Sequence, residues 1–281
     1  MSLRLELEEA PAHGRFLFRG PGFVAQDHLG RRVVKYDCGG VASYDYRRRQ
    51  GRISAKDPVR LRELAYLALL SRTGEALDRA GLHRVHALGF ESGGRGGLLL
   101  LPSGGGKSTL ALELLRRSEA GLLSDDTPVV GVDGSLRAFP LRMGFKPGAD
   151  LEGVPARHRR SLIRRRYEPK VVVDVDYFRG RVPFAARPRW LVVGRSSRGA
   201  PALRRCGKAK AAAALSSALV LGWGVAQMSE YMIRPDFSLA SIALSRAKAA
   251  AALLARCELL ELRLGESPAE AADLLAELWA S

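Results

Sequence analysis

The chain has 281 residues, of which 47% are hydrophobic and 26% charged, so it can bury a substantial core without disulfides or structural metals. The cysteines Cys38, Cys206 and Cys257 lie far apart and outside any CxxC spacing, which argues against a disulfide framework or a zinc site and favours a reducing compartment. The formal net charge of +16 suits a phosphorylated substrate, an acidic peptide or a nucleic acid without choosing among them.

Residues 1–56 are predicted to form a small β-rich N-terminal module. β-Branched or aromatic residues recur at 16–18, 33–36 and 41–46, and glycines separate these runs. A linking helix is predicted within residues 57–84, because Asp57 and Pro58 are typical of a helix start and apolar residues follow at helical spacing.

Residues 85–281 are predicted to form an α/β core. Apolar runs at 97–101 and 121–123 flank a predicted helix at 108–117, an order typical of a βαβ unit. Asp133 and Gly134, between two apolar runs, predict a hairpin with a type I′ turn, so the core sheet should be mixed. Further elements are predicted as strands at 170–175, 190–193 and 260–264, helices at 211–228 and 239–256, and a last helix after the capping box of Ser267, Pro268 and Glu270.

One uncharged run, residues 211–229, is long enough to be weighed as a membrane span. It is rich in alanine, serine and glycine and contains Gln227, so its hydropathy favours a buried helix. The first ten residues, MSLRLELEEA, lack the basic start and apolar run of a signal peptide. We therefore expect a cytoplasmic protein without a membrane span.

The run LLLLPSGGGKSTLALELL has the order of a phosphate-binding loop: a buried strand, glycines, a lysine, two hydroxyl residues and a helix. Lys107 would reach the β and γ phosphates of ATP, and Ser108 would ligate Mg²⁺. Leu101 stands where the strict GxxxxGK[ST] pattern has glycine, and the alternative is a glycine-rich turn that precedes Lys-Ser-Thr by chance. The predicted nucleotide-binding residues are Ser103, Gly104, Gly105, Gly106, Lys107, Ser108 and Thr109.

Asp125 and Asp126 follow a predicted strand, eighteen residues after Lys107. This interval accommodates a helix, a turn and a neighbouring strand, which would bring both carboxylates beside the phosphates. One carboxylate could then ligate Mg²⁺ while the other accepts a proton from an acceptor hydroxyl. The alternative is a simple turn, because Asp-Asp-Thr-Pro is also good turn chemistry.

Residues 85–130 resemble the HPr kinase/phosphatase superfamily, whose P-loop core is related to that of phosphoenolpyruvate carboxykinase. The matching features are a histidine before the loop, the loop SGGGKS, a helix and a strand that ends in Asp-Asp. The layout is most similar to stand-alone peptide serine kinases, such as lasso-peptide kinases, and the superfamily makes a homo-oligomer reasonable. The resemblance implies that Asp125 is the base, that Asp126 and Ser108 hold Mg²⁺, and that His86 is an accessory active-site residue. For His86 alone, packing at a strand end is an equal alternative.

Two further basic features have candidate roles. Arg142 and Lys146 follow the hairpin closely enough to return toward the phosphates, where Arg142 would neutralise developing charge; surface solubility is the alternative. Residues 157–166 form the densest cationic run, suited either to an acidic or phosphate-bearing substrate or to a solvated helix face. Few aromatic residues are interleaved with that run, which argues against a nucleic-acid partner.

The sequence thus predicts an α/β P-loop kinase core with a mixed β-sheet flanked by helices, preceded by the β-rich module. The predicted activity is Mg²⁺-dependent transfer of the ATP γ-phosphate to a serine-type hydroxyl on a peptide or protein. A nucleotide-binding regulatory ATPase that phosphorylates no acceptor and a kinase of a small-molecule alcohol are the alternatives. The sequence does not name the acceptor, because specificity depends on loops and surface shape.

Overall fold

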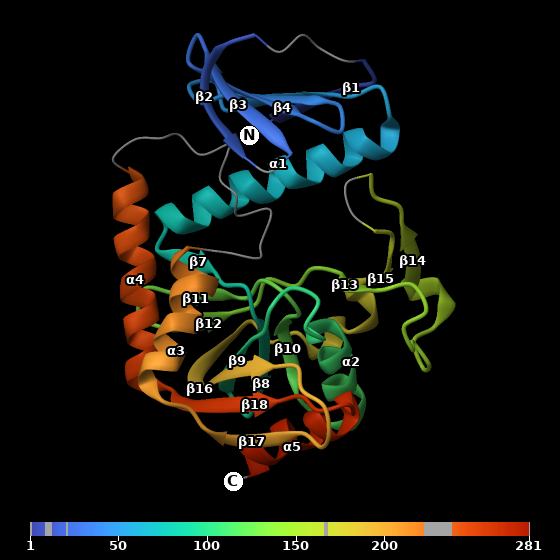
Figure 1. Ribbon diagram of the computed structural model, residues 1–281, viewed down its shortest axis with the longest axis vertical. Helices are drawn as coiled ribbons and strands as arrows, with labels where there is room; N and C mark the ends of the chain where they lie inside the picture. The colour runs from blue at the N-terminus through green and yellow to red at the C-terminus, as the bar shows by residue number, and fades with distance from the viewer. Residues whose placement is uncertain (1, 9–12, 21, 166–167, 222–237, 281) are drawn as a thin grey trace. The chain divides into compact units, whose positions relative to one another are not determined.

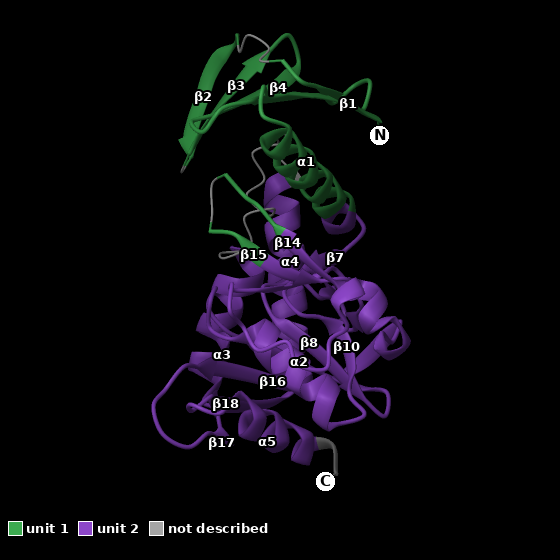
Figure 2. Ribbon diagram, turned by 90° about the vertical axis from the view of Figure 1, so that its right-hand side faces the viewer, with its two compact units in different colours: residues 1–76, 162–170, 226–238 green, residues 77–161, 171–225, 239–281 purple. Residues whose placement is uncertain are grey.

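The computed structural model describes residues 2–8, 13–20, 22–165, 168–221 and 238–280 (Figure 1). Over these residues the protein is of the mixed α/β class, with several β-sheets and five α-helices. The chain divides into two compact units, the first of which contains residues 1–76 and the second most of the chain from Leu77 onward (Figure 2). The expected α/β class is confirmed at this level.

The first unit is built on a six-stranded sheet with the strand order β1-β6-β5-β4-β3-β2. Its neighbouring strands are antiparallel, except for β1 and β6, which are parallel. One face of the sheet packs against helix α1 (Pro58–Arg79), because inward side chains such as Val34 and Ile53 share a core with Leu61 and Leu64. The strands are β1 (Ser2–Glu6), β2 (Arg15–Gly20), β3 (Phe23–His28), β4 (Arg31–Tyr36), β5 (Val41–Asp45) and β6 (Gln50–Ser54).

The second unit contains a nine-stranded sheet, and the prediction that this sheet is mixed is confirmed. Its main path is β10-β8-β9-β16-β12-β11-β7, and β18 pairs with β16 and β17. Strands β9, β16 and β18 are parallel, and the other pairings are antiparallel. The strands are β7 (Leu82–Arg84), β8 (Leu88–Ser92), β9 (Arg95–Leu100), β10 (Gly121–Ser124), β11 (Val129–Gly131), β12 (Leu136–Arg137), β16 (Ala185–Arg195), β17 (Ala202–Arg205) and β18 (Glu258–Arg263).

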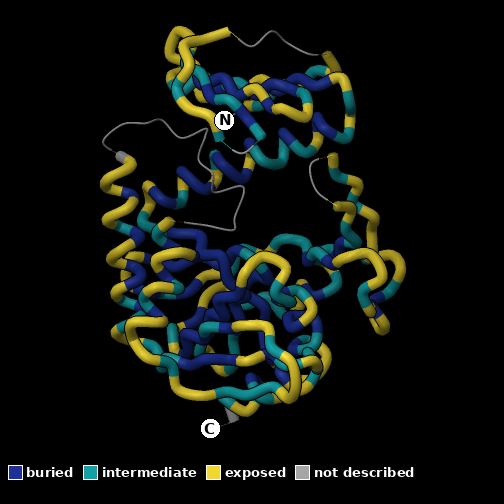
Figure 3. Tube along the Cα trace, viewed as in Figure 1, coloured by how far each residue is buried: buried dark blue, intermediate teal, exposed yellow. Residues whose placement is uncertain are grey.

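Helices cover both faces of this sheet, so its central strands are buried on both sides (Figure 3). On β9, Leu99 belongs to the core formed with α2 (Lys107–Arg117) and α5 (Pro268–Ala280). Leu98 and Leu100 belong instead to the core formed with α3 (Lys208–Leu215) and α4 (Ser238–Arg256). A strand buried on both faces needs apolar side chains at successive positions, which explains the unbroken leucine run.

The C-terminal elements agree with the prediction. Strand β18 and helices α4 and α5 lie where the sequence placed them, and Ser267 Oγ accepts a hydrogen bond from the Glu270 backbone N–H at 3.2 Å, as expected of the helix cap. In the uncharged run, α3 continues into a π-helical turn at Ser216–Val220, and residues 222–229 lie outside the described residues. No helix in the described ranges is long and apolar enough to cross a membrane.

Two features of the middle of the chain were left open by the sequence. The strand predicted at 170–175 is present as β15 (Lys170–Val173), which lies between β13 (Met143–Phe145) and β14 (Arg159–Leu162) in a separate three-stranded sheet. Of the two alternatives for the basic run, the structure excludes the helix face, because β14 follows a single 3₁₀ turn at Ala156–His158. At least one of its arginines is engaged by the backbone of the same chain: Arg159 donates to the carbonyl oxygens of Leu151 and Val154, both at 2.6 Å.

The predicted hairpin is present, but its turn is not type I′. Type I′ needs a positive φ at both central residues, whereas here Gly134 has φ of 84° and Asp133 has no positive φ. The Gly134 N–H donates to the Gly131 carbonyl at 2.8 Å, and the Gly131 N–H donates to the Ser135 carbonyl at 2.8 Å. The connection is therefore a three-residue loop with glycine in the left-handed position, because Val132 adds one residue to the turn.

Glu261 on β18 is a buried carboxylate paired with three partly exposed cations, and this arrangement predicts a pH dependence of stability. Its side chain is 5% exposed and lies 2.8 Å from Lys210, 3.0 Å from Arg204 and 3.2 Å from Arg195. The hydrogen bond from Lys210, followed by that from Arg204, outweighs burial and lowers the pKa of Glu261 to about 2.

We expect Glu261 to stabilise the fold above its ordinary pKa of 4.5 and to lose that contribution as the pH falls toward 2, because its folded-state pKa is depressed. The measurement is urea unfolding of the wild type and of Glu261→Gln across this range. The difference in unfolding free energy should be constant down to pH 4.5 and then shrink. A difference that does not change with pH would contradict an ionic role for Glu261.

Candidate functional site

The topology brings three separated segments to one edge of the second unit's sheet. Strand β8 lies between β9 and β10 and is antiparallel to both. The carboxyl ends of β9 and β10 therefore meet the amino end of β8 at the same edge. The glycine loop follows β9, the two aspartates follow β10, and His86 precedes β8. Residues nearly forty positions apart in sequence are placed together by this order.

The glycine loop turns sharply into helix α2. The Gly105 N–H donates to the Pro102 carbonyl at 3.0 Å, and Gly106, with φ of 97°, is the residue before the helix. Ser103 and Gly104 are exposed, as is Thr109 in the first turn of the helix. A helix start preceded by such a loop presents unsatisfied backbone N–H groups and a partial positive charge, which is the arrangement that binds phosphate.

Lys107 is the central cation of the site, and only 6% of it is exposed. Its Nζ donates to the carbonyl oxygens of Leu101, at 2.8 Å, and Pro102, at 3.1 Å. The same Nζ lies 2.5 Å from His86 Nε2 and 3.8 Å from Asp126 Oδ1. The ammonium group is thus held at the mouth of the loop, within reach of both a histidine and a carboxylate.

The two adjacent aspartates face different partners. Asp125 is 4% exposed, and its Oδ2 accepts a hydrogen bond from Ser108 Oγ at 2.8 Å. The Asp126 side chain is 44% exposed, and its Oδ1 lies 3.5 Å from His86 Nε2. The sequence could not separate these two environments, because neighbouring residues in a turn can point in either direction.

Ser124 is a residue of this site that sequence reasoning did not single out. Its Oγ accepts the backbone N–H of Thr127 at 3.1 Å and that of Asp126 at 3.5 Å, so it fixes the turn that carries both carboxylates. The Asp126 carbonyl in turn accepts the Ala87 N–H at 3.1 Å, which ties the aspartates to the histidine segment. The available signal was a serine directly before Asp-Asp-Thr-Pro, which is typical of a side-chain-stabilised turn.

The other predicted cations lie close by in sequence but differ in exposure. Arg142 is half-buried directly before β13, a strand that contacts α2, while Lys146 is exposed in the turn after β13. These positions leave Arg142 as the better candidate of the two for a role near the loop.

The residues at this edge include oxygen donors of the type that magnesium prefers, although they do not form a preassembled cage. Within the described ranges, no group of three or more histidine, cysteine, aspartate or glutamate side chains is arranged to hold a metal ion. Mg²⁺ in phosphate sites is usually held by one or two carboxylates together with phosphate oxygens and water. The oxygens of Ser108 and Asp125, 2.8 Å apart, are of the right chemical type for that role.

No family model matches the chain, and no curated protein matches it. The assignment of a function therefore depends on the residues of this edge and on their chemistry.

Proposed function

We propose that this protein is a kinase that transfers the γ-phosphate of ATP to a serine-type hydroxyl on a peptide or protein. The observation that carries the proposal is the convergence of Lys107, Ser108 and two carboxylates at the start of α2. The loop and helix N-terminus would bind the phosphates, and Lys107 would compensate their charge. Ser108 and Asp125 would hold Mg²⁺, which would neutralise negative charge on the phosphates when bound.

The geometry supports a division of labour between the aspartates that is the reverse of the one implied by the resemblance. Asp125 is buried against Ser108, which favours the metal side. Asp126 is the more exposed carboxylate, so it can meet an incoming hydroxyl and accept its proton. The acceptor oxygen then bonds to the γ-phosphorus as the bond to the β,γ-bridging oxygen breaks, and ADP leaves.

The test is transfer of labelled γ-phosphate from Mg²⁺–ATP to a panel of serine-containing peptides and small alcohols. Label on a peptide supports the proposal, whereas label on an alcohol alone points to a small-molecule kinase. Tight nucleotide binding with no labelled product would overturn the kinase proposal in favour of a regulatory nucleotide-binding protein.

The variants Asp126→Asn and Asp125→Asn separate the two carboxylate roles. We expect Asp126→Asn to lower transfer at least about a hundredfold while Mg²⁺-dependent nucleotide binding is retained, because only the proton acceptor is lost. Asp125→Asn should instead raise the Mg²⁺ concentration needed for half-maximal nucleotide binding. The opposite pattern would restore Asp125 as the base. Equal, near-normal activity of both variants would contradict a catalytic role for the pair.

A further inference from the structure

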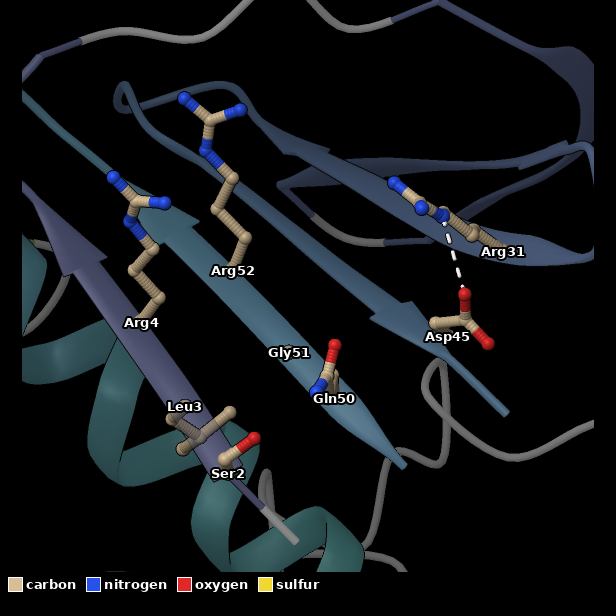
Figure 4. A pocket seen from close by; sticks show the side chains of 8 residues that line it. All are labelled: Ser2, Leu3, Arg4, Arg31, Asp45, Gln50, Gly51 and Arg52. Carbon is tan, nitrogen blue, oxygen red and sulfur yellow. Dashed lines mark ion pairs between the residues drawn. The ribbon is translucent and has the colours of Figure 1, made fainter. Parts of the chain in front are cut away.

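The first unit carries a basic surface on the face of its sheet that is turned away from α1. Arg4 on β1 pairs in register with Arg52 on β6, which pairs with Ser43 on β5. Two positions along β5, Asp45 pairs with Arg31 on β4. Side chains alternate between faces along a strand, and the opposite face holds the core shared with α1, so these arginines point outward (Figure 4).

This surface is hollowed into two adjoining pockets. The first, about 410 Å³, is lined among others by Arg4, Arg31, Arg52 and Asp45 (Figure 4). The second, about 520 Å³, shares Arg31 and Asp45 and adds Arg47 and Arg48. Five arginines and one carboxylate therefore line the two pockets together, and even with Glu6 and Glu8, which pair with Arg4 and Arg52, the hollow keeps a net positive charge.

Several of these arginines already form ion pairs with carboxylates of the same unit. Arg31 lies 3.3 Å from Asp45, and Arg52 lies 2.5 Å from Glu6 and 3.3 Å from Glu8. Even with these ion pairs, the Arg31 and Arg52 side chains remain about half exposed. A guanidinium group has five N–H donors in a planar fork, so the exposed N–H groups of these arginines can donate to further carboxylates in bidentate geometry.

An exposed leucine in a strained conformation stands beside the arginines. Leu29 lines the second pocket at the turn between β3 and β4, is 91% exposed and has φ of 48°. This left-handed conformation disfavours leucine, and glycine or asparagine is preferred at such turns. A strained, solvent-exposed apolar side chain contributes little to the fold, and residues in such strained conformations cluster at functional and ligand-binding sites.

We propose that this surface, defined by Leu29, Arg4, Arg31, Arg48 and Arg52, binds an extended acidic peptide that carries an apolar side chain. The carboxylates would pair with the arginines, and the apolar side chain would pack on Leu29. Neither pocket lining contains phenylalanine, tyrosine or tryptophan, so the stacking platform typical of single-stranded nucleic-acid sites is missing from these residues.

This proposal does not depend on the kinase activity, because binding is measured without nucleotide. The probe is a fluorescein-labelled peptide of alternating glutamate and leucine, and its binding to the 281-residue chain is measured by fluorescence anisotropy. The charge-reversal variant Arg31→Glu/Arg52→Glu is expected to raise Kd about tenfold or more. The matched variant Arg198→Glu/Arg263→Glu makes the same charge change at exposed positions of the second unit and should leave Kd nearly unchanged.

A second variant separates binding from folding. Leu29→Gly relieves the strained φ, so it should raise the melting temperature while it weakens peptide binding severalfold. The proposal is overturned if both charge-reversal variants weaken binding equally, if Leu29→Gly binds as tightly as the wild type, or if an alternating lysine–leucine peptide binds as well. Tighter binding of a short oligothymidylate at the same arginines would also overturn it, in favour of a nucleic-acid site.

Discussion

Lys107→Met is expected to lower phosphate transfer by about two to three orders of magnitude, because it removes the cation that would compensate the charge of the transferred phosphate. Methionine keeps the unbranched length of the side chain and so preserves most of its packing in this 6% exposed position. The measurement is transfer of labelled γ-phosphate at saturating Mg²⁺–ATP, together with nucleotide affinity. Loss of transfer with partial retention of affinity would show that the ammonium group acts mainly during the reaction.

The matched control for this experiment is Lys248→Met, which removes an exposed lysine from another helix of the same unit. This control should retain wild-type transfer. Because Lys107 also hydrogen-bonds two loop carbonyls, thermal melting must show that its variant is folded. Near-normal turnover of a folded Lys107→Met protein would refute the kinase proposal at its central residue.

The strand, glycine loop and helix at residues 95–117 were predictable because the information that specifies them is local. Strand β9, the glycine loop and α2 are consecutive in sequence, and the leucine run of a strand buried on both faces is distinctive. The interval to Asp125 was also sufficient to place the aspartates after a further strand of the sheet, but the prediction that this strand neighbours β9 was wrong, because β10 pairs with β8. The insertion of β8 between β9 and β10 was not predicted, and it is this strand that brings His86 to the same edge.

Other features of the site and of the first unit could not be predicted, because they depend on contacts that the order of residues does not show. Which aspartate meets Ser108 is decided within one turn, and Ser124 holds that turn through two backbone N–H groups. Strands β1 (SLRLE) and β6 (QGRIS) were missed because arginines and other polar side chains on the outward face dilute their apolar pattern. Arg4 and Arg52 are 48 positions apart and become neighbours only through the parallel pairing of those strands.

The buried ionic group around Asp78 carries the largest expected effect on stability. Asp78 lies at the end of α1, in the second unit, and its Oδ1 is 2.7 Å from His83 Nδ1. Arg246 on α4 donates to both carboxylate oxygens, at 3.1 Å and 2.5 Å. His83 Nε2 lies 2.8 Å from Ser245 Oγ. The Asp78 carboxylate and the His83 ring therefore together connect the end of α1 and β7 to α4.

Burial alone would raise the pKa of Asp78, but the hydrogen bonds from His83 and Arg246 outweigh it, and the net pKa is lowered from 3.8. A carboxyl group with a depressed folded-state pKa stabilises the protein above its ordinary pKa, and this contribution is lost as the pH falls through the folded-state value. The ionised carboxylate is therefore the form that holds the cluster together at neutral pH.

Asp78→Asn is expected to reduce the free energy of unfolding by about 3–5 kcal/mol at neutral pH, because it leaves the buried Arg246 without its counter-ion. The matched surface variant Asp273→Asn, which breaks an exposed pair with Arg117, should cost less than about 1 kcal/mol. The measurement is urea unfolding of both variants and of the double variant Asp78→Asn/Arg246→Met. The double variant should be more stable than Asp78→Asn alone, because it no longer contains the buried, unpaired charge of Arg246. If Asp78→Asn cost no more than Asp273→Asn, the cluster would have to be regarded as a set of contacts that contributes little to the stability of the second unit.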